Sequence, residues 1–242
     1  ISLTLVIAIV FNGSFKETWD NRDFLIKCIA GDIVLLITSW ITYRVKRKSI
    51  RSQNEYKNSD MDEKAILELA STDHELMQKI KNYSESLYVH SLRTGNVSGM
   101  AAEFAGYGKN LARAGGFYHE AGRIYGNEDY KEACSQIAKE FAFPIQLEDI
   151  IKQHGEVPEK PGSPEAAVVM LSDSIISTDE YFDRTGKREQ IPDEKLVKSV
   201  FNSRLANGSL DNSGIDKENI EKLMDFYINN AFKEETREEH YL

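Results

Sequence analysis

The stretch "SPEAAVVMLSDSII", residues 163–176, predicts an amphipathic helix. Ser163 suits the N-cap, and Pro164 suits the first helical residue because a missing N–H costs nothing there. Apolar residues then return at spacings of three and four, the period of a helix that packs on one side. The same period recurs over residues 62–242, whereas the alternation typical of strands is hard to find. The sequence therefore predicts an all-α fold.

Glycines and prolines divide the periodic segments. Gly106, Gly108, Gly122 and Pro144 end a helix or keep one from starting, and so does the turn "GEVPEKPGSP", residues 155–164. Helices are expected over residues 62–70, 73–82, 86–105, 109–121, 128–141, 145–153, 164–183, 193–206 and 216–232.

Length, charge and cysteine content limit the classes of function. The chain has 242 residues, which leaves room for one domain of ordinary size and a smaller part. Its formal net charge is -9 and its main body lacks a long Lys/Arg stripe, so a nucleic-acid duplex is not an expected partner. Cys28 and Cys134 are the only cysteines, which argues against a disulfide framework or a Cys-based zinc site and fits a reducing cytoplasm.

Two apolar stretches near the beginning of the chain predict membrane segments. Residues 1–10, "ISLTLVIAIV", are too short to cross a bilayer and are expected to end a transmembrane helix, with a signal peptide as the alternative. Residues 24–43, "FLIKCIAGDIVLLITSWITY", would form a helix about 30 Å long, the thickness of the hydrocarbon core. Lys27 and Asp32 oppose this prediction because charge inside a membrane is costly, so an amphipathic soluble helix is the alternative.

The residues around the end of this helix favour the membrane. The basic run "RVKRK", residues 44–48, is typical of the cytoplasmic side, and Trp40 and Tyr43 lie near that interface. The rest of the chain is therefore expected in the cytoplasm. The expected parts are the C-terminal portion of a transmembrane region (1–48, with a loop over 11–23), a polar linker (49–61) and a cytoplasmic helical domain (62–242).

A few polar side chains fall on the apolar faces of the expected helices. Asp173 lies on such a stripe and must pair, become protonated or bind a metal, because burying a lone carboxylate is prohibitively costly. A hydrogen bond to neighbouring backbone or to an arginine is the simpler alternative. His90 lies on a similar stripe in "LYVHSLRTGNV", and alone it would be a hydrogen-bonded core histidine. His119 and Glu120 stand together in "YHEAGR", where they are a candidate half of a metal site or a polar couple at a helix end.

Together these residues resemble the metal-site pattern of the HD phosphohydrolase superfamily. That pattern is a histidine, then a His-Asp doublet that closes a helix before a glycine, and then a distal aspartate. His90 matches the first histidine, "HEAGR" matches the segment around the doublet, and Asp173 matches the last aspartate.

The resemblance narrows to the seven-transmembrane receptors with an intracellular HD hydrolase domain. It covers roughly residues 62–235 and includes several segments in the same order. It implies a transmembrane bundle in the cell membrane, followed by a cytoplasmic HD domain, a helical bundle that hydrolyses cyclic di-AMP. The segments are "ILELASTDHELMQKI", "YVHSLRTGNVSGMAAEFA", "LARAGGFYHEAGRI", "EKPGSPEAAVVMLSDSI" and "LVKSVFNSRLANGSLDNSGI".

The resemblance also implies a site. Imidazole and carboxylate ligands together suit a divalent Mn, Fe or Zn ion rather than Ca or Mg. Glu120 would serve in catalysis as well as in metal binding, while Arg123 and His154 would contact the phosphate. The implied metal ligands are His90, His119, Glu120 and Asp173.

Departures from the family pattern bear on catalysis. Glu120 stands where the family has an aspartate that bridges two metals, and the extra methylene shifts its oxygens by about an ångström, against a tolerance near 0.5 Å. No histidine occurs between Ile124 and His154, where the family has another ligand, and Gln153 replaces one member of a His-His pair. Arg123 replaces a lysine, which keeps the charge but changes its shape. The sequence therefore predicts one divalent ion rather than two.

Three functions stay open at this point. The first is a membrane-anchored, metal-dependent phosphodiesterase that acts on a cyclic dinucleotide with a reduced metal site. The second is a catalytically weak or inactive HD domain that binds a nucleotide or a metal and passes a signal to or from the membrane helices. The third is a membrane-anchored helical domain whose polar cluster is only structural. The number of subunits is also open, a homodimer included.

Overall fold

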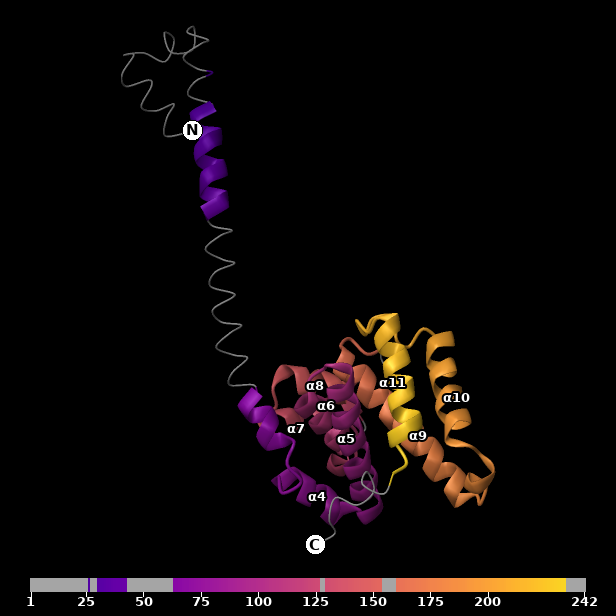
Figure 1. The fold of residues 1–242 in the computed structure, drawn as a ribbon. Helices are drawn as coiled ribbons and strands as arrows, with labels where there is room; N and C mark the ends of the chain where they lie inside the picture. The colour runs from indigo at the N-terminus through magenta and orange to yellow at the C-terminus, as the bar shows by residue number, and fades with distance from the viewer. Residues whose placement is uncertain (1–25, 27–29, 43–62, 127–128, 154–159, 234–242) are drawn as a thin grey trace, which may run out of the picture. The chain divides into compact units, whose positions relative to one another are not determined.

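The structure is a computed structural model that describes residue 26 and residues 30–42, 63–126, 129–153 and 160–233 (Figure 1). Every regular element in this described part is helical, which confirms the predicted all-α class. The chain divides into two compact units, Ile1–Met61 and Asp62–Leu242.

The first unit is described only in part. Residue 26 and residues 30–42 are helical, within the helix that the sequence predicts over 24–43. Among the residues that the structure describes, no helix is both long and apolar enough to cross a membrane. The membrane helix therefore stays a prediction. The expected helix end (1–10), loop (11–23), basic flank (44–48) and linker (49–61) lie outside the described residues.

The second unit contains every helix expected after residue 61, with ends that differ by at most a few residues. Its first helix covers residues 63–69. Two short 3-10 helices, which the sequence did not predict, are η1 (Ala121–Tyr125) and η2 (Arg188–Gln190). The remaining helices are α4 (Glu75–Tyr83), α5 (Glu85–Ala105), α6 (Lys109–Tyr118), α7 (Tyr130–Glu140), α8 (Ile145–Lys152), α9 (Pro164–Arg184), α10 (Asp193–Ala206) and α11 (Lys217–Asn230).

Local sequence signals fix the ends of the two longest helices. The Ser163 hydroxyl accepts a hydrogen bond from the Ala166 N–H at 3.2 Å, and Pro164 is the first residue of α9, as predicted. The Ser84 hydroxyl caps α5 in the same way. Gly106 ends α5 with φ of 81°, a left-handed conformation that glycine adopts without the Cβ clash of other residues.

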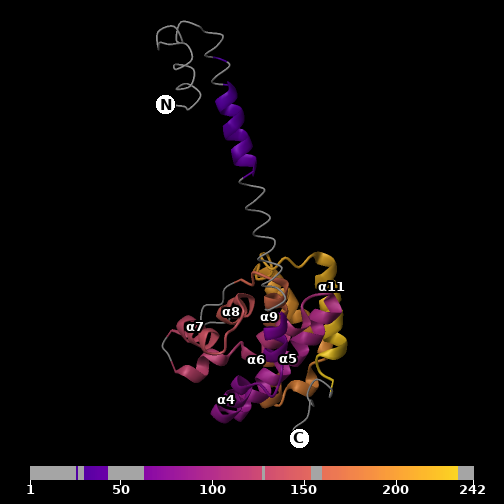
Figure 2. The same ribbon diagram turned by 90° about the vertical axis from the view of Figure 1, so that its left-hand side faces the viewer.

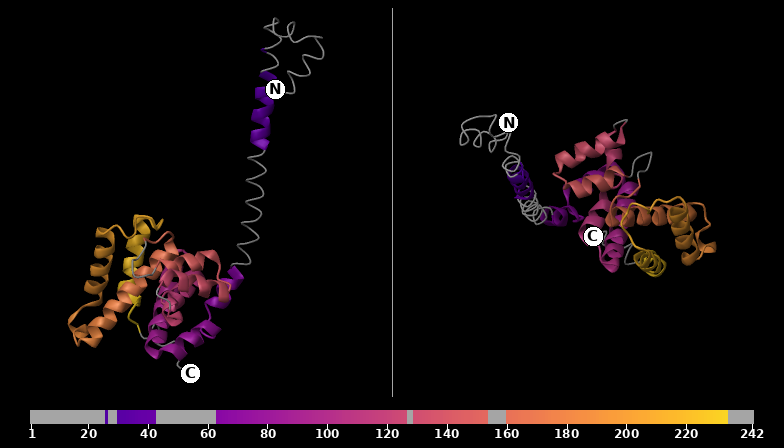
Figure 3. Two further views of the ribbon diagram at one scale, coloured as in Figure 1. Left: turned by 180° about the vertical axis from the view of Figure 1, so that it is seen from behind. Right: turned by 90° about the horizontal axis from the view of Figure 1, so that it is seen from above.

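Helices α5 and α6 lie in the middle of the second unit, between two groups of helices (Figure 2). One core cluster joins them to α4, α7 and α8, and includes Tyr118, Ile137 and Leu147. Another joins them to α9, α10 and α11, and includes Val97 and Phe201. Seen from above, the α7–α8 pair and the α10–α11 pair extend to different sides of this centre (Figure 3). Side chains near the middle of α5 are therefore enclosed on both sides.

Helices α5 and α6 approach each other through glycine. A Cβ added to Gly116 of α6 would lie 2.6 Å from the Cα of Gly95 in α5, closer than real Cβ atoms come. The two backbones are therefore in direct contact at this crossing. Gly95 follows His90 by five residues in α5, and Gly116 precedes His119 by three residues, so this contact lies about one helical turn from the histidine pair and limits how far apart the two helices hold it.

Candidate metal centre

Three helices supply the residues that the sequence singled out. His90 lies in α5, His119 and Glu120 follow the last residue of α6, and Asp173 lies in the middle of α9. These four residues are called the metal cluster below. Because α5, α6 and α9 pack against one another, side chains that are far apart in the sequence meet at one place.

The end of α6 differs from the predicted end and places the His-Glu doublet. The sequence predicts a helix to residue 121, but α6 ends at Tyr118 and the chain tightens into η1. The Tyr130 hydroxyl donates to the carbonyl oxygen of His119, which satisfies one of the acceptors that a helix end leaves open. Gly122 permits this packing, since a Cβ there would lie 2.5 Å from a ring carbon of Tyr130.

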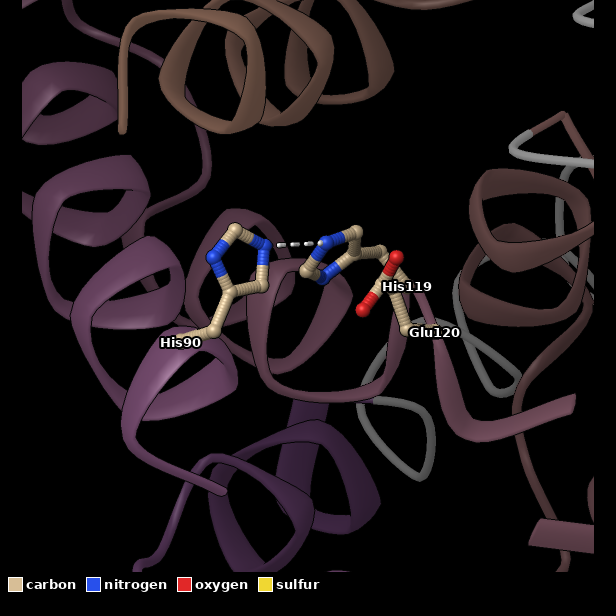
Figure 4. A group of neighbouring side chains, drawn as sticks. All are labelled: His90, His119 and Glu120. Carbon is tan, nitrogen blue, oxygen red and sulfur yellow. Dashed lines mark hydrogen bonds between the residues drawn. The ribbon is translucent and has the colours of Figure 1, made fainter. Parts of the chain in front are cut away.

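Ring nitrogens and a carboxylate converge in the metal cluster. The Nε2 atoms of His90 and His119 are 3.2 Å apart, and Figure 4 shows that these nitrogens point toward each other. One carboxylate oxygen of Asp173, Oδ1, lies 3.2 Å from His90 Nε2 and 3.5 Å from His119 Nε2. The side chain of Glu120 lies beside His119 (Figure 4), and ligand atoms of His90, His119 and Glu120 all lie within 4.8 Å of one another.

The cluster is largely shielded from water. The side chain of His119 is fully buried, and those of His90 and Asp173 are 11% and 16% exposed. The prediction that Asp173 falls on the inner face of its helix is therefore confirmed. The Ser177 hydroxyl, one turn further along α9, donates to Asp173 Oδ1 at 3.0 Å.

The other ring nitrogen of each histidine has an acceptor. His119 Nδ1–H donates to the backbone carbonyl of Gly116 at 2.8 Å. His90 Nδ1–H donates to the carboxylate of Glu180, at 3.0 and 3.2 Å from its two oxygens. Histidines that bind metals are commonly held in this way, because the bond fixes the tautomer and leaves Nε2 as the ligand atom.

The donor set and its spacing fit a divalent ion. Two ligand atoms that bind one metal at about 2.1 Å lie roughly 3.0–3.4 Å apart for octahedral or tetrahedral angles. The distances between the two Nε2 atoms and Asp173 Oδ1 range from 3.2 to 3.5 Å. Mixed nitrogen and oxygen ligands suit Mn, Fe or Zn.

Residues 87–178, which include the whole metal cluster, match the HD domain family. This chain carries an HD domain. The resemblance that the sequence indicated is thereby confirmed.

A phosphodiesterase and several ribonucleases are among the curated relatives of the HD domain. The cyclic-di-AMP phosphodiesterase PgpH of Bacillus subtilis is 25% identical over 194 residues, which cover 59% of this chain and 27% of that protein. Ribonuclease Y of Opitutus terrae is 31% identical over 111 residues, which cover 43% of this chain and 21% of that protein. The chain thus spans about a quarter of the length of these relatives.

Solved structures share the fold of the HD domain. The HD domain of the L. monocytogenes phosphodiesterase PgpH, in complex with cyclic-di-AMP, aligns with a TM-score of 0.54 and 20% identity. The alignment covers 64% of this chain and 94% of that chain. At this level of identity the likeness shows a common fold, and the expected HD-type helical bundle is confirmed.

The charge of His90 depends on its carboxylate neighbours. Burial acts to lower the pKa of the imidazole, but hydrogen bonds and charges from Asp173 and Glu180 raise the pKa to about 10. Protonated His90 donates its Nε2–H to Oδ1 of Asp173 at 3.2 Å. A metal ion that binds Nε2 of His90 would have to displace this proton.

Two of the three predicted catalytic residues lie in the described part of the HD domain. Arg123, in η1, has a side chain that is 61% exposed and pairs with Glu120 at 2.5 Å. His154 lies outside the described residues, so its predicted contact with phosphate stays a prediction. A pocket of about 370 Å³ is lined by His90, Glu120 and Arg123, among others, and connects the cluster with solvent.

The sequence did not reveal two features near the site. One is Glu180, the partner of His90; its spacing of seven residues after Asp173, which places both on one face of α9, could have indicated it. The other is the Asp179 network, in which the buried Asp179 pairs with Arg93 at 2.6 Å and also with Arg188. Asp179 follows Ile175 and Ile176 at helical spacing, so the helical period could have placed it on the inner face of α9, but no sequence pattern identifies its two arginine partners.

Proposed function

We propose that the HD domain binds a divalent metal ion and hydrolyses a phosphodiester bond of a cyclic dinucleotide. The observation that carries this proposal is the convergence of His90 Nε2, His119 Nε2 and Asp173 Oδ1 within 3.5 Å. The fold shared with a PgpH HD domain in complex with cyclic-di-AMP supports the substrate class. The proposed ligands are His90, His119, Glu120 and Asp173.

The residues around the pocket would bind and orient the substrate. A divalent ion, when bound, supplies Lewis acidity toward a phosphoryl oxygen. Arg123 offers an exposed guanidinium, which suits bidentate binding of phosphate. A phosphate that binds Arg123 would compete with Glu120 for the guanidinium and free the Glu120 carboxylate to turn toward the two histidines. His154 is a third proposed contributor, as a phosphate ligand.

We further propose that the site holds one ion rather than two. Glu120 is longer than the aspartate that the HD pattern has at this position, and its carboxylate is held by Arg123 in the structure. Both features support weak catalysis. They also favour the alternative function, an HD domain that binds a nucleotide without turnover and acts as a signalling module.

Metal content and turnover of the full chain test these functions. Elemental analysis after loading with Mn²⁺ gives the metal per chain, and chromatography gives the release of linear dinucleotide from cyclic di-AMP. One ion per chain with slow release, both lost in His119→Ala, would support the phosphodiesterase. Bound metal and nucleotide without turnover would support the signalling module. Neither metal nor nucleotide bound would reject both functions.

Shortening the acidic ligand tests the reduced site. Glu120→Asp restores the side chain of the family pattern and should raise turnover or metal content. Glu132→Asp, on the exposed side of α7, is the matched control and should change neither. A single-stranded RNA is included as a second substrate because ribonuclease Y is among the relatives. The net charge of -9 supports the smaller ligand over RNA.

Attachment to the cell membrane and assembly are also parts of the proposal. The apolar residues 24–43 and the basic residues 44–48 support an anchor with the HD domain in the cytoplasm. Fractionation of cells that express the chain tests this. A homodimer is tested by light scattering of the purified chain.

A further inference from the structure

One face of α9 continues past Asp173 along the pocket. Ser177, Glu180, Tyr181 and Arg184 follow at helical spacing and all line the pocket. The first two already have partners in the metal cluster, because Ser177 donates to Asp173 and Glu180 accepts from His90. Tyr181 and Arg184 remain, and neither serves the cluster.

Tyr181 and Arg184 form a pair at the end of this face. Tyr181 is 50% exposed. Its ring packs edge-on against the ring of Phe182, with the ring centres 5.6 Å apart. The guanidinium carbon of Arg184 lies 6.0 Å from the centre of the Tyr181 ring. An aromatic face and a cation therefore stand next to each other beside a candidate metal site.

The charges of the pocket favour an anion at Arg184. Glu120 is compensated by Arg123, and Glu180 is compensated by His90. In the part of the chain that the structure describes, no carboxylate pairs with Arg184. The alternative is that Arg184 has only a structural role: it lies in the last turn of α9, where a cation interacts favourably with the helix dipole.

We propose that Tyr181 and Arg184 form a nucleotide subsite beside the metal cluster, in which the Tyr181 ring stacks on a base and Arg184 binds a phosphate. This inference rests on the proposed function and names the residues that recognise its substrate. Bases stack on aromatic side chains irrespective of sequence. The planar guanidinium matches phosphate oxygens in a bidentate manner. Base and phosphate of one nucleotide are joined through one ribose, which requires both contacts to be close together.

Calorimetric titration of the full chain tests the subsite. The probes are Mn²⁺ alone, cyclic di-AMP with Mn²⁺, and AMP with Mn²⁺. Tyr181→Ala and Arg184→Gln should each weaken the binding of both nucleotides about tenfold or more, as expected for loss of a stacked base or a charged phosphate contact. Mn²⁺ binding should change less than twofold, because neither residue touches the cluster. Tyr181→Phe, which keeps the ring face, should bind nucleotide like the unaltered chain.

A control and the contrary outcomes separate this inference from the proposed function. Lys198→Gln removes an exposed cation on α10 and should bind both nucleotides unchanged. Unchanged nucleotide binding by Arg184→Gln or Tyr181→Ala would overturn the subsite while leaving the proposed function intact. AMP binding that depends on both residues, without any binding of cyclic di-AMP, would keep the subsite and reject the proposed substrate. Binding of neither nucleotide by the unaltered chain would overturn both.

Discussion

Two buried charged groups lie between the same helices, α5 and α9, and differ in how their charges are matched. In the metal cluster, His90 of α5 meets Asp173 of α9, and several electron-pair donors face one point. In the Asp179 network, Arg93 of α5 meets Asp179 of α9, and Arg188 adds a second guanidinium. The proposed metal ion would complete the first group, whereas in the second the two arginines already compensate the carboxylate. Burial of charge therefore does not indicate a functional site unless the partners are also known.

Asp173→Asn should have the largest effect, a loss of Mn²⁺ affinity that distinguishes the metal cluster from the Asp179 network. The amide keeps the shape of the carboxylate but loses its charge, so the affinity for Mn²⁺ should fall by more than about 100-fold, beyond the loss typical of an outer partner. Stability without metal should fall by less than in Asp179→Ala, because the amide oxygen can still accept from His90 and Glu180 keeps its charge beside that ring. Calorimetry measures the Mn²⁺ affinity, and urea unfolding measures the stability without metal. Asp183→Asn, exposed on the same helix, is the control, and unchanged Mn²⁺ affinity in Asp173→Asn would contradict the assignment.

Asp179→Ala should show the opposite pattern. It leaves two guanidinium groups without their buried partner, which costs on the order of 3–5 kcal/mol of unfolding free energy. Mn²⁺ affinity should stay within twofold of the unaltered value. Urea unfolding measures the loss, with Asp183→Ala as the matched control. A destabilisation no larger than that of the control would show that the network contributes nothing to stability.

Glu180→Gln should have a smaller effect on the metal cluster. His90 Nδ1–H can still donate to the amide oxygen, but the charge that makes the imidazole a better ligand is gone. Loss of such a partner lowers metal affinity by about 10- to 100-fold. Titration with Mn²⁺ measures this, and Glu194→Gln, an exposed residue on α10, is the control. If Glu180→Gln binds Mn²⁺ as tightly as Glu194→Gln does, Glu180 does not support His90 as a metal ligand.

The smallest expected effect is on the pH dependence of stability, which depends on Asp179. Burial acts to raise the pKa of Asp179, but hydrogen bonds and charges from Arg188 and Arg93 outweigh it and lower the pKa. A carboxyl that is more acidic when folded stabilises the protein above its ordinary pKa of about 4 and loses this contribution as the pH falls through its folded value. Urea midpoints between pH 5 and pH 3 should therefore decline more steeply in the unaltered chain than in Asp179→Asn. Parallel declines would contradict this account.

The same two groups show what the sequence could predict. Helical period and glycine and proline positions predicted the helices well, because each signal acts within a few residues. The inward position of Asp173 followed from the same period. The partner of a buried charge is chosen by tertiary packing, so periodicity alone could not distinguish Asp173 from Asp179. The choice of Asp173 as a ligand came from the resemblance of the whole set of residues to a family pattern, and its role in binding a metal stays a proposal.

The turn into η1 could not be predicted either, because it depends on contacts with α7. The sequence placed His119 and Glu120 inside a helix that reaches residue 121, while the structure ends α6 at Tyr118. Tyr130 holds the His119 carbonyl there, and the sequence offers no local sign of this contact. The membrane segments and His154 remain predictions from sequence.

The contact between Gly95 and Gly116 determines how closely the helices that carry His90 and His119 can approach each other. Because the backbones of α5 and α6 touch there, no side chain can relax to absorb an added methyl group. Gly116→Ala would therefore push α5 and α6 apart and increase the distance between His90 and His119, although neither histidine is altered. The spacing of the two histidines thus depends on two residues that have no side chain and that are not members of the metal cluster.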